Sequence, residues 1–174
     1  VERRLSEVLR LSGGLKLRFA TVEQRRQEED FLLLSSPWRL TLDRRDDRLD
    51  PASGFLLTVL EEPFVDLGDA DVFFTRQEIG GSWYKALDAE ENWVFAVRAR
   101  LGSITGDVLE DIPADTRFYA GGGGSVRGYG FEKIGPEECG EVTGGRSLAE
   151  GSVEMRRRLT ERLGLAVFVD GGAA

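Results

Sequence analysis

The sequence has no histidine, one cysteine and one methionine. Without histidine, the chain can form neither a histidine-containing catalytic triad nor a histidine metal site. The lone Cys139 lies in the polar segment GPEECGEVTGG, so no intrachain disulfide can form and we expect a free thiol. No stretch approaches the roughly 18 apolar residues of a membrane-spanning helix.

Positive charge is also in deficit. The 174 residues include 23 lysines and arginines against 31 aspartates and glutamates, a formal net charge of −8 at pH 7. This balance argues against a nucleic-acid partner, which would require a basic face. The length is sufficient for one ordinary domain with its own core. Because no methionine or signal peptide opens the chain and it stops just after a strand-like run, we expect a fragment of a larger protein.

What the sequence does contain is alternation of apolar and polar residues, the period of β-strands with two different faces. In WVFAVRARL, residues 93–101, five apolar side chains share one face and the other face includes Arg98 and Arg100. Residues 151–159 and 163–170 have the same period, although Arg157 interrupts the apolar face of the first run.

The period is weaker in five further runs, residues 2–14, 15–26, 30–43, 54–62 and 71–87. The first run also fits one face of an amphipathic helix, and we favour a strand. Turn-forming residues separate the runs at 12–14, 46–54, 67–71 and 88–92. About eight strands joined by hairpins, without a convincing long helix, predict an antiparallel all-β protein.

The apolar faces of these strands can be covered in two ways. In a soluble sandwich or barrel they form a shared core, whereas in a membrane barrel they face lipid and the charged faces line a polar lumen. Arginines and glutamates on neighbouring strands fit a wet lumen, and runs of about nine to eleven residues fit a tilted membrane strand. Trp38, Trp83 and Trp93 lie near strand ends, as in an aromatic girdle. Composition alone does not decide between a soluble protein with a shared core and a membrane barrel with lipid-facing strands.

The most unusual segment is RFYAGGGGSVRGYGFEKIGP, residues 117–136. A dinucleotide fingerprint that starts at Gly121 or Gly122 would have Val126 or Arg127 in place of its third glycine, and no helix follows. A P-loop in this segment would have Tyr129 where lysine is required. Phosphate binding is therefore disfavoured. Glycine also permits positive φ and close backbone approach, which a loop that folds back into a barrel requires.

Arg127 is the candidate anchor of such a loop, because a guanidinium can make paired hydrogen bonds to carboxylates. Glu154 and Asp170 lie on the charged faces of the next two predicted strands, and their parity places both on the lumen side. We predict that the arginine contacts both acids. The alternatives are a salt bridge with no active role and ordinary lumen-facing charge.

This segment resembles the VRGY/F loop signature of the outer-membrane protein assembly factor superfamily, which includes BamA, TamA and two-partner secretion transporters. In that family the loop folds into a barrel of about sixteen strands. Its arginine contacts a glutamate in G-x-x-E and an aspartate in F-x-D-x-G, which here are Glu154 in GSVE and Asp170 in FVDGG. The resemblance assigns the loop-anchoring motif to Gly121, Gly122, Ser125, Val126, Arg127, Gly128 and Tyr129.

A further match is DRRDDRLDPASG, which resembles the family's D-x-R-D…P-x-x-G strand and turn. It assigns that motif to Asp43, Arg45, Asp46, Pro51 and Gly54. The resemblance covers residues 37–172 and is strongest to TamA-type members. It implies that residues 1–174 are a partial C-terminal β-barrel domain, with POTRA domains and the final strands outside the chain.

The function implied by this resemblance is insertion or translocation of autotransporters and other barrel proteins in the bacterial outer membrane. Strand exchange at the barrel seam would carry it, without catalysis, cofactor or metal. The implied partners are the lipid bilayer, client outer-membrane proteins and a TamB-like protein anchored in the inner membrane. The alternative within the family is a two-partner secretion transporter that exports one dedicated substrate through the pore.

Three other functions are conceivable from the residue types alone. A paired-carboxylate hydrolase is disfavoured because nothing places two acids in a closed pocket. A metal cluster at Asp43, Arg45 and Asp46 is disfavoured because the glycine and terminal glutamate of a calcium loop are missing at the required offsets. A soluble all-β binding module with the glycine loop as a ligand lid stays open.

Overall fold

The computed structural model describes residues 1–24, 27–68, 72–138 and 140–174. Cys139, with its predicted free thiol, and parts of the runs 15–26 and 67–71 lie outside them. The described residues are almost all antiparallel β-structure, which confirms the predicted fold class. Their helical segments are two single 3-10 turns, Leu109–Asp111 and Ala114–Thr116. Neither could cross a membrane by length and apolarity.

Ten strands form one sheet, and each pairs with its neighbours antiparallel. Its path runs β1-β2-β5-β6-β7-β8-β11-β12, while β4 pairs with β6 and β3 pairs with β4. The bounds are β1 Glu2–Arg4, β2 Leu9–Gly13, β3 Lys16–Gln24, β4 Gln27–Ser35, β5 Trp38–Asp43, β6 Gly54–Asp66, β7 Phe73–Ala86, β8 Trp93–Gly106, β11 Ser147–Arg158 and β12 Gly164–Ala173. A separate hairpin pairs β9, Glu137–Glu138, with β10, Glu141–Val142.

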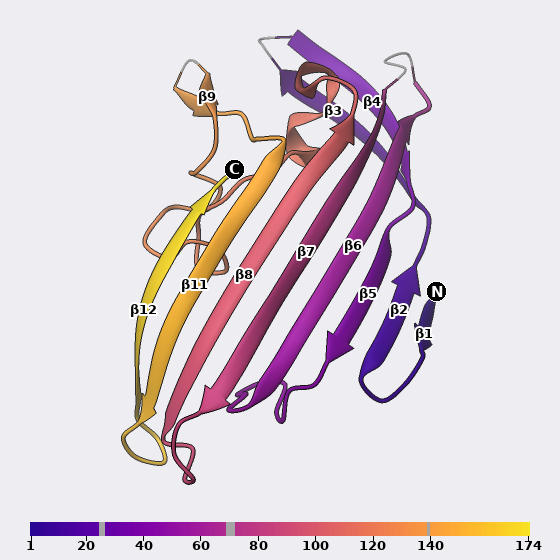
Figure 1. Cartoon of the computed structure of the whole chain (residues 1–174). Helices are drawn as coiled ribbons and strands as arrows, with labels where there is room; N and C mark the ends of the chain where they lie inside the picture. The colour runs from indigo at the N-terminus through magenta and orange to yellow at the C-terminus, as the bar shows by residue number, and fades with distance from the viewer. Residues whose placement is uncertain (25–26, 69–71, 139) are drawn as a thin grey trace.

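The longest connection of the sheet, between β8 and β11, lies at one of its two ends, where the link from β6 to β7 is short (Figure 1). This longest connection is the segment 107–146. Short turns at residues 44–53, 87–92 and 159–163 join the long strands at the other end. We call this other end the short-turn end.

Two predicted runs are each divided in the structure. Residues 2–14 form the hairpin β1-β2, in which the backbone N–H of Leu5 donates to the carbonyl of Leu9 at 2.9 Å, so the strand assignment is confirmed and the helical one is wrong. The run 30–43 breaks at Pro37, where β4 ends and β5 begins. Proline has no N–H to donate to a ladder. The sheet therefore has ten strands where the periodicity predicts about eight.

The register aligns apolar residues in rows across one face of the sheet. Phe55, Trp83, Val97, Val153 and Val169 are successive cross-strand partners from β6 to β12. Trp83, Val153 and Val169 are exposed, at 44%, 47% and 75%. The opposite face carries the polar row that includes Arg98, Ser152 and Asp170. An apolar outer face with a charged inner face is the pattern of a membrane barrel rather than of a soluble core.

A compact apolar cluster lies at the end of the sheet where β8 leads into the long segment 107–146. Its buried members are Phe31, Leu33, Phe64, Val72, Phe74, Ile104, Ile112, Phe118, Ala120 and Leu148. Phe118 and Ala120 belong to the base of the glycine-rich loop. Their backbones pair with Gly145 and Ile134 in isolated antiparallel bridges. The cluster therefore fixes where the loop starts.

Candidate loop-anchoring site on the lumen face

The glycine-rich segment folds as a tight loop that requires glycine at particular positions. Gly121, Gly122 and Gly128 have φ values of 104°, 102° and 93°. A Cβ added to Gly121 would lie 2.5 Å from the carbonyl oxygen of Gly130, whereas one added to Gly124 would meet nothing within 4 Å. Positive φ and close backbone approach thus require some of the four consecutive glycines and not others.

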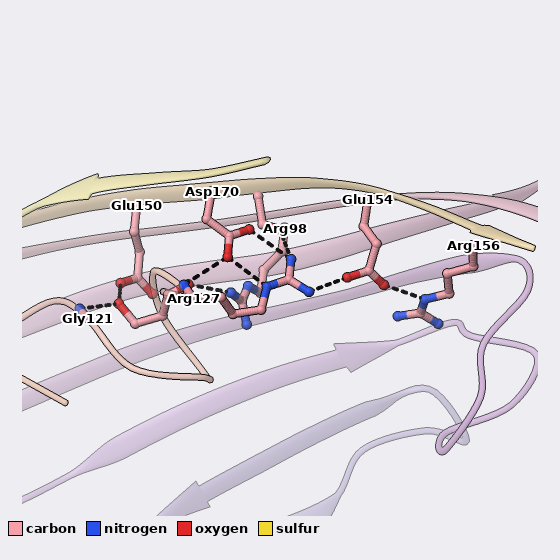
Figure 2. A network of polar contacts seen from close by, with 9 residues as sticks. Arg98, Gly121, Arg127, Glu150, Glu154, Arg156 and Asp170 are labelled. Atoms are coloured by element: carbon pink, nitrogen blue, oxygen red, sulfur yellow. Dashed lines mark hydrogen bonds and ion pairs between the residues drawn. The ribbon is translucent and has the colours of Figure 1, made fainter. Parts of the chain in front are cut away.

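Arg127 contacts both predicted acids at the inner face of the sheet (Figure 2). Its Nε and Nη2 donate to the two carboxylate oxygens of Asp170 on β12 at 2.7 and 2.8 Å, a bidentate arrangement. Its Nη1 donates to Glu154 Oε2 on β11 at 2.5 Å. Its Nη2 also donates to Ser152 Oγ at 2.8 Å. We call Arg127, Ser152, Glu154 and Asp170 the Arg127 cluster.

Backbone and ring contacts reinforce this ionic cluster. The backbone N–H of Arg127 donates to Asp170 Oδ2 at 2.9 Å, so one carboxylate holds both the main chain and the side chain of the loop residue. The guanidinium carbon lies 3.4 Å from the centroid of the Phe168 ring, a cation–π geometry. Glu154 accepts a second bond from Arg156 Nε at 2.6 Å and thus bridges two arginines.

The cluster is largely shielded from water. The side chains of Arg127, Glu154 and Asp170 are 25%, 13% and 2% exposed. The hydrogen bonds to Asp170, and then those to Glu154, raise the pKa of the Arg127 guanidinium above its ordinary value, so the loop carries a permanent positive charge. Charge-assisted bonds at this burial are stronger than those between neutral groups.

A second set of contacts holds the residues that precede Arg127. Arg98 Nη2 on β8 donates to the Ser125 carbonyl at 2.8 Å, and Ser125 Oγ donates to Glu150 on β11. The side chain of Val126 is buried. A Cβ added to Gly172 on β12 would lie 2.9 Å from Val126 Cγ2, so the small residue leaves room for this valine. The loop is therefore attached to β8, β11 and β12.

Some of these contacts involve residues that the sequence did not single out as partners. Ser152, Phe168, Arg98 and Glu150 all touch the loop, and each has the inward parity of its strand. This inward position was the sequence signal that could have identified them as neighbours of the loop. Tyr129, assigned to the motif by resemblance, is 61% exposed.

The second motif organises the turn between β5 and β6. Arg45 Nε and Nη2 donate to the two oxygens of Asp43 at 2.9 and 3.0 Å. The Asp46 carboxylate accepts three backbone N–H groups, from residues 47, 52 and 53, beside the buried Pro51. Burial raises the pKa of Asp46, but these three bonds outweigh it and hold the value below the ordinary 3.8. Gly54 has φ of 98°, and a Cβ there would lie 2.1 Å from the Arg44 carbonyl oxygen.

The chemistry that these two sites support is mechanical attachment. In the Arg127 cluster both carboxylates accept bonds from arginine, which joins a loop to two strands. Within the described ranges, no group of three or more histidine, cysteine, aspartate or glutamate residues is placed to hold a metal ion. An apolar outer face, a charged inner face and a loop attached inside define a membrane β-barrel segment.

The family follows from comparison with known proteins. The Omp85 superfamily domain matches residues 3–174, and the chain belongs to this superfamily. It is 30% identical over 138 residues to the outer membrane protein assembly factor BamA of Nitratidesulfovibrio vulgaris, covering 77% of this chain and 17% of BamA. It is 29% identical over 157 residues to the Sorting and assembly machinery component 50 homolog of Homo sapiens, covering 89% of this chain and 32% of that protein.

A solved structure shows the same fold. BamA from Haemophilus ducreyi lacking POTRA domains 1–3 matches with a TM-score of 0.79 at 18% identity, over 99% of this chain and 40% of that one. The chain spans about a third or less of the length of the curated relatives described above. The superfamily predicted from the loop motif is thereby confirmed, and the match fits a part of an outer-membrane barrel.

Proposed function

We propose that this chain is part of the barrel of a TamA-like outer-membrane protein assembly factor, which inserts or translocates autotransporters and other β-barrel proteins. The observation that carries the proposal is the loop held against the inner face by Arg127, Glu154 and Asp170. The names of these two relatives support assembly rather than export, because both describe assembly components.

The proposed mechanism is strand exchange at a weak seam of the barrel. An edge strand offers unpaired backbone N–H and C=O groups, and an incoming client strand can pair with them without nucleotide, cofactor or metal. The Arg127 cluster and the loop residues 121–129 would keep the lumen in the shape that this exchange requires. The turn motif from Asp43 to Gly54 would hold β5 and β6 together at the short-turn end.

We further propose the bacterial outer membrane as the location, with client outer-membrane proteins and a TamB-like protein of the inner membrane as partners. The acidic net charge of −8 supports a role without nucleic acid. The apolar residues at the outward register positions support direct contact with the lipid bilayer.

The test uses the full-length protein reconstituted in liposomes, with a urea-unfolded autotransporter barrel as client. Folded client is measured by heat-modifiable mobility on gels for wild type, Arg127→Ala and Arg127→Lys. We expect loss of assembly in the alanine variant and partial recovery with lysine, because lysine cannot reproduce the bidentate geometry. Wild-type assembly by both variants would refute the proposal, and secretion of a soluble substrate without client folding would indicate the export alternative.

A further inference from the structure

Few charged residues occupy the outward face of the long strands. Strands β5, β6, β7, β8, β11 and β12 are described throughout, and their outward register positions carry three charged residues, Glu61, Lys85 and Arg157. Glu61 lies opposite Gln77, whose amide donates to it at 3.3 Å. Unlike Glu61, the cations Lys85 and Arg157 lie at the short-turn end. Each is one residue from the end of its strand.

The two cations flank β8 from its two sides. Lys85 on β7 is the cross-strand partner of Phe95, and Arg157 on β11 is the partner of Trp93. The Arg157 guanidinium carbon lies 4.6 Å from the centroid of the Trp93 ring. Among the residues that the structure describes, neither cation has an ion pair. The nearby Asp88 carboxylate accepts the backbone N–H groups of Asn92 and Trp93.

The depth of these cations determines what can neutralise them. A charged side chain on the lipid face is strongly disfavoured at the bilayer midplane and tolerated near the headgroups. Strand ends reach the headgroup region, where tryptophan is also favoured. In outer-membrane barrels the short turns lie on the periplasmic side. Arg157 and Lys85, which have no ion pair among the described residues, thus lie at one leaflet together with the exposed Trp93.

We propose that Lys85, Trp93 and Arg157 form a binding patch for the phosphate headgroups of anionic phospholipids at the short-turn end of the barrel. The Arg157 guanidinium can bind two phosphate oxygens, and the Lys85 ammonium supplies a second positive charge across β8. Trp93 holds the guanidinium at headgroup depth. The patch requires only that the sheet spans a bilayer, so it is independent of the assembly activity.

The test measures lipid retention by the full-length protein in detergent, using native mass spectrometry with phosphatidylglycerol and phosphatidylcholine as probes. We expect wild type to retain phosphatidylglycerol preferentially. The double variant Lys85→Gln/Arg157→Gln should lose this preference by about fivefold for each removed cation. The matched control is Arg158→Gln, which removes the same charge one residue further along β11 from an inward side chain that lies 3.7 Å from Asp50.

Two outcomes would overturn the proposal. One is an unchanged preference in the double variant, and the other is an equal loss in Arg158→Gln, which would indicate a response to net charge alone. Arg157→Lys provides a second check, because it keeps the charge and should keep most of the preference. If the double variant fails to fold, each single glutamine variant carries the same test with about fivefold loss expected.

Discussion

Truncation of Arg127 to alanine should release the loop from the inner face of the barrel. The substitution removes four side-chain hydrogen bonds, to Asp170 twice and to Ser152 and Glu154 once each. It leaves the Asp170 carboxylate, 2% exposed, without its cation. Removing one partner of a buried ion pair costs about 3–5 kcal/mol. Because Arg127 is itself a quarter exposed, we expect the lower end, about 3 kcal/mol.

The measurement is amide hydrogen exchange of residues 121–129 in the folded full-length protein, since local opening of the loop exposes these amides. A loss of about 3 kcal/mol corresponds to exchange roughly 100-fold faster or more. The matched control is Arg18→Ala, which breaks an ion pair with Asp115 at 3.0 Å between side chains that are 36% and 43% exposed. That pair should contribute less than about 1 kcal/mol. Exchange in Arg127→Ala within threefold of wild type would refute the reasoning.

A double-mutant cycle separates direct pairing from a general disturbance of the lumen. Arg127→Ala is combined with Asp170→Asn, and loop opening is measured for both single variants and the double variant. Residues in one hydrogen-bond network show coupling of about 0.5–3 kcal/mol, and we expect a value near the upper end because the contact is bidentate. Coupling near zero would mean that the contacts in the structure do not hold the loop.

Three further predictions concern the glycines and the β5-β6 turn. Gly121→Ala should speed exchange in the loop strongly while Gly124→Ala should not, because only the former has positive φ and a backbone oxygen 2.5 Å from the added Cβ. Gly54→Ala should lower the free energy of unfolding by at least about 1–3 kcal/mol in a urea titration, owing to positive φ and a backbone clash. Because the pKa of Asp46 is lowered in the folded state, its contribution to stability is present above pH 3.8 and is lost as pH falls through the folded-state pKa. The free energy of unfolding of Asp46→Asn should therefore differ from that of wild type near pH 7 and converge with it in acid. A difference from Asp46→Asn that is independent of pH would contradict this assignment.

The strands could be predicted where the outward residues face hydrocarbon. In β8 the alternation over residues 93–101 is clear because the outward residues are all apolar, whereas the inward residues include Arg98 and Arg100. The strand continues to Gly106, and the sequence missed this extension because its outward positions there are Ser103 and Thr105. Outside the hydrocarbon layer both faces can be polar, so the period carries no signal. The strand break at Pro37 follows from the missing backbone N–H of proline. The alternation of apolar and polar residues does not reveal such a break.

The site could be predicted as a set of residues but not as a geometry. Parity and resemblance together single out Arg127, Glu154 and Asp170, and the structure places them in contact. Parity fixes the face of each residue but not its height relative to the neighbouring strand. Ser152 and Phe168 become neighbours of Arg127 through the β11-β12 register, which pairs Ser152 with Asp170. Register is set by pairing and packing across strands, which spacing along one strand does not encode.

The charges of the inner face explain why the loop attaches where it does. Glu150 has Arg100 at 3.0 Å and Glu154 has Arg156 at 2.6 Å, so both acids keep an arginine partner when the loop is absent. Among the described ion pairs, Asp170 has a cationic partner only in Arg127. A buried carboxylate without a cation is costly, and docking of the loop removes that cost. Asp170→Asn should therefore release the loop more than Glu154→Gln does, because Glu154→Gln leaves the bidentate contact between Arg127 and Asp170 in place. Equal effects of the two substitutions would mean that the whole hydrogen-bond network, rather than Asp170, anchors the loop.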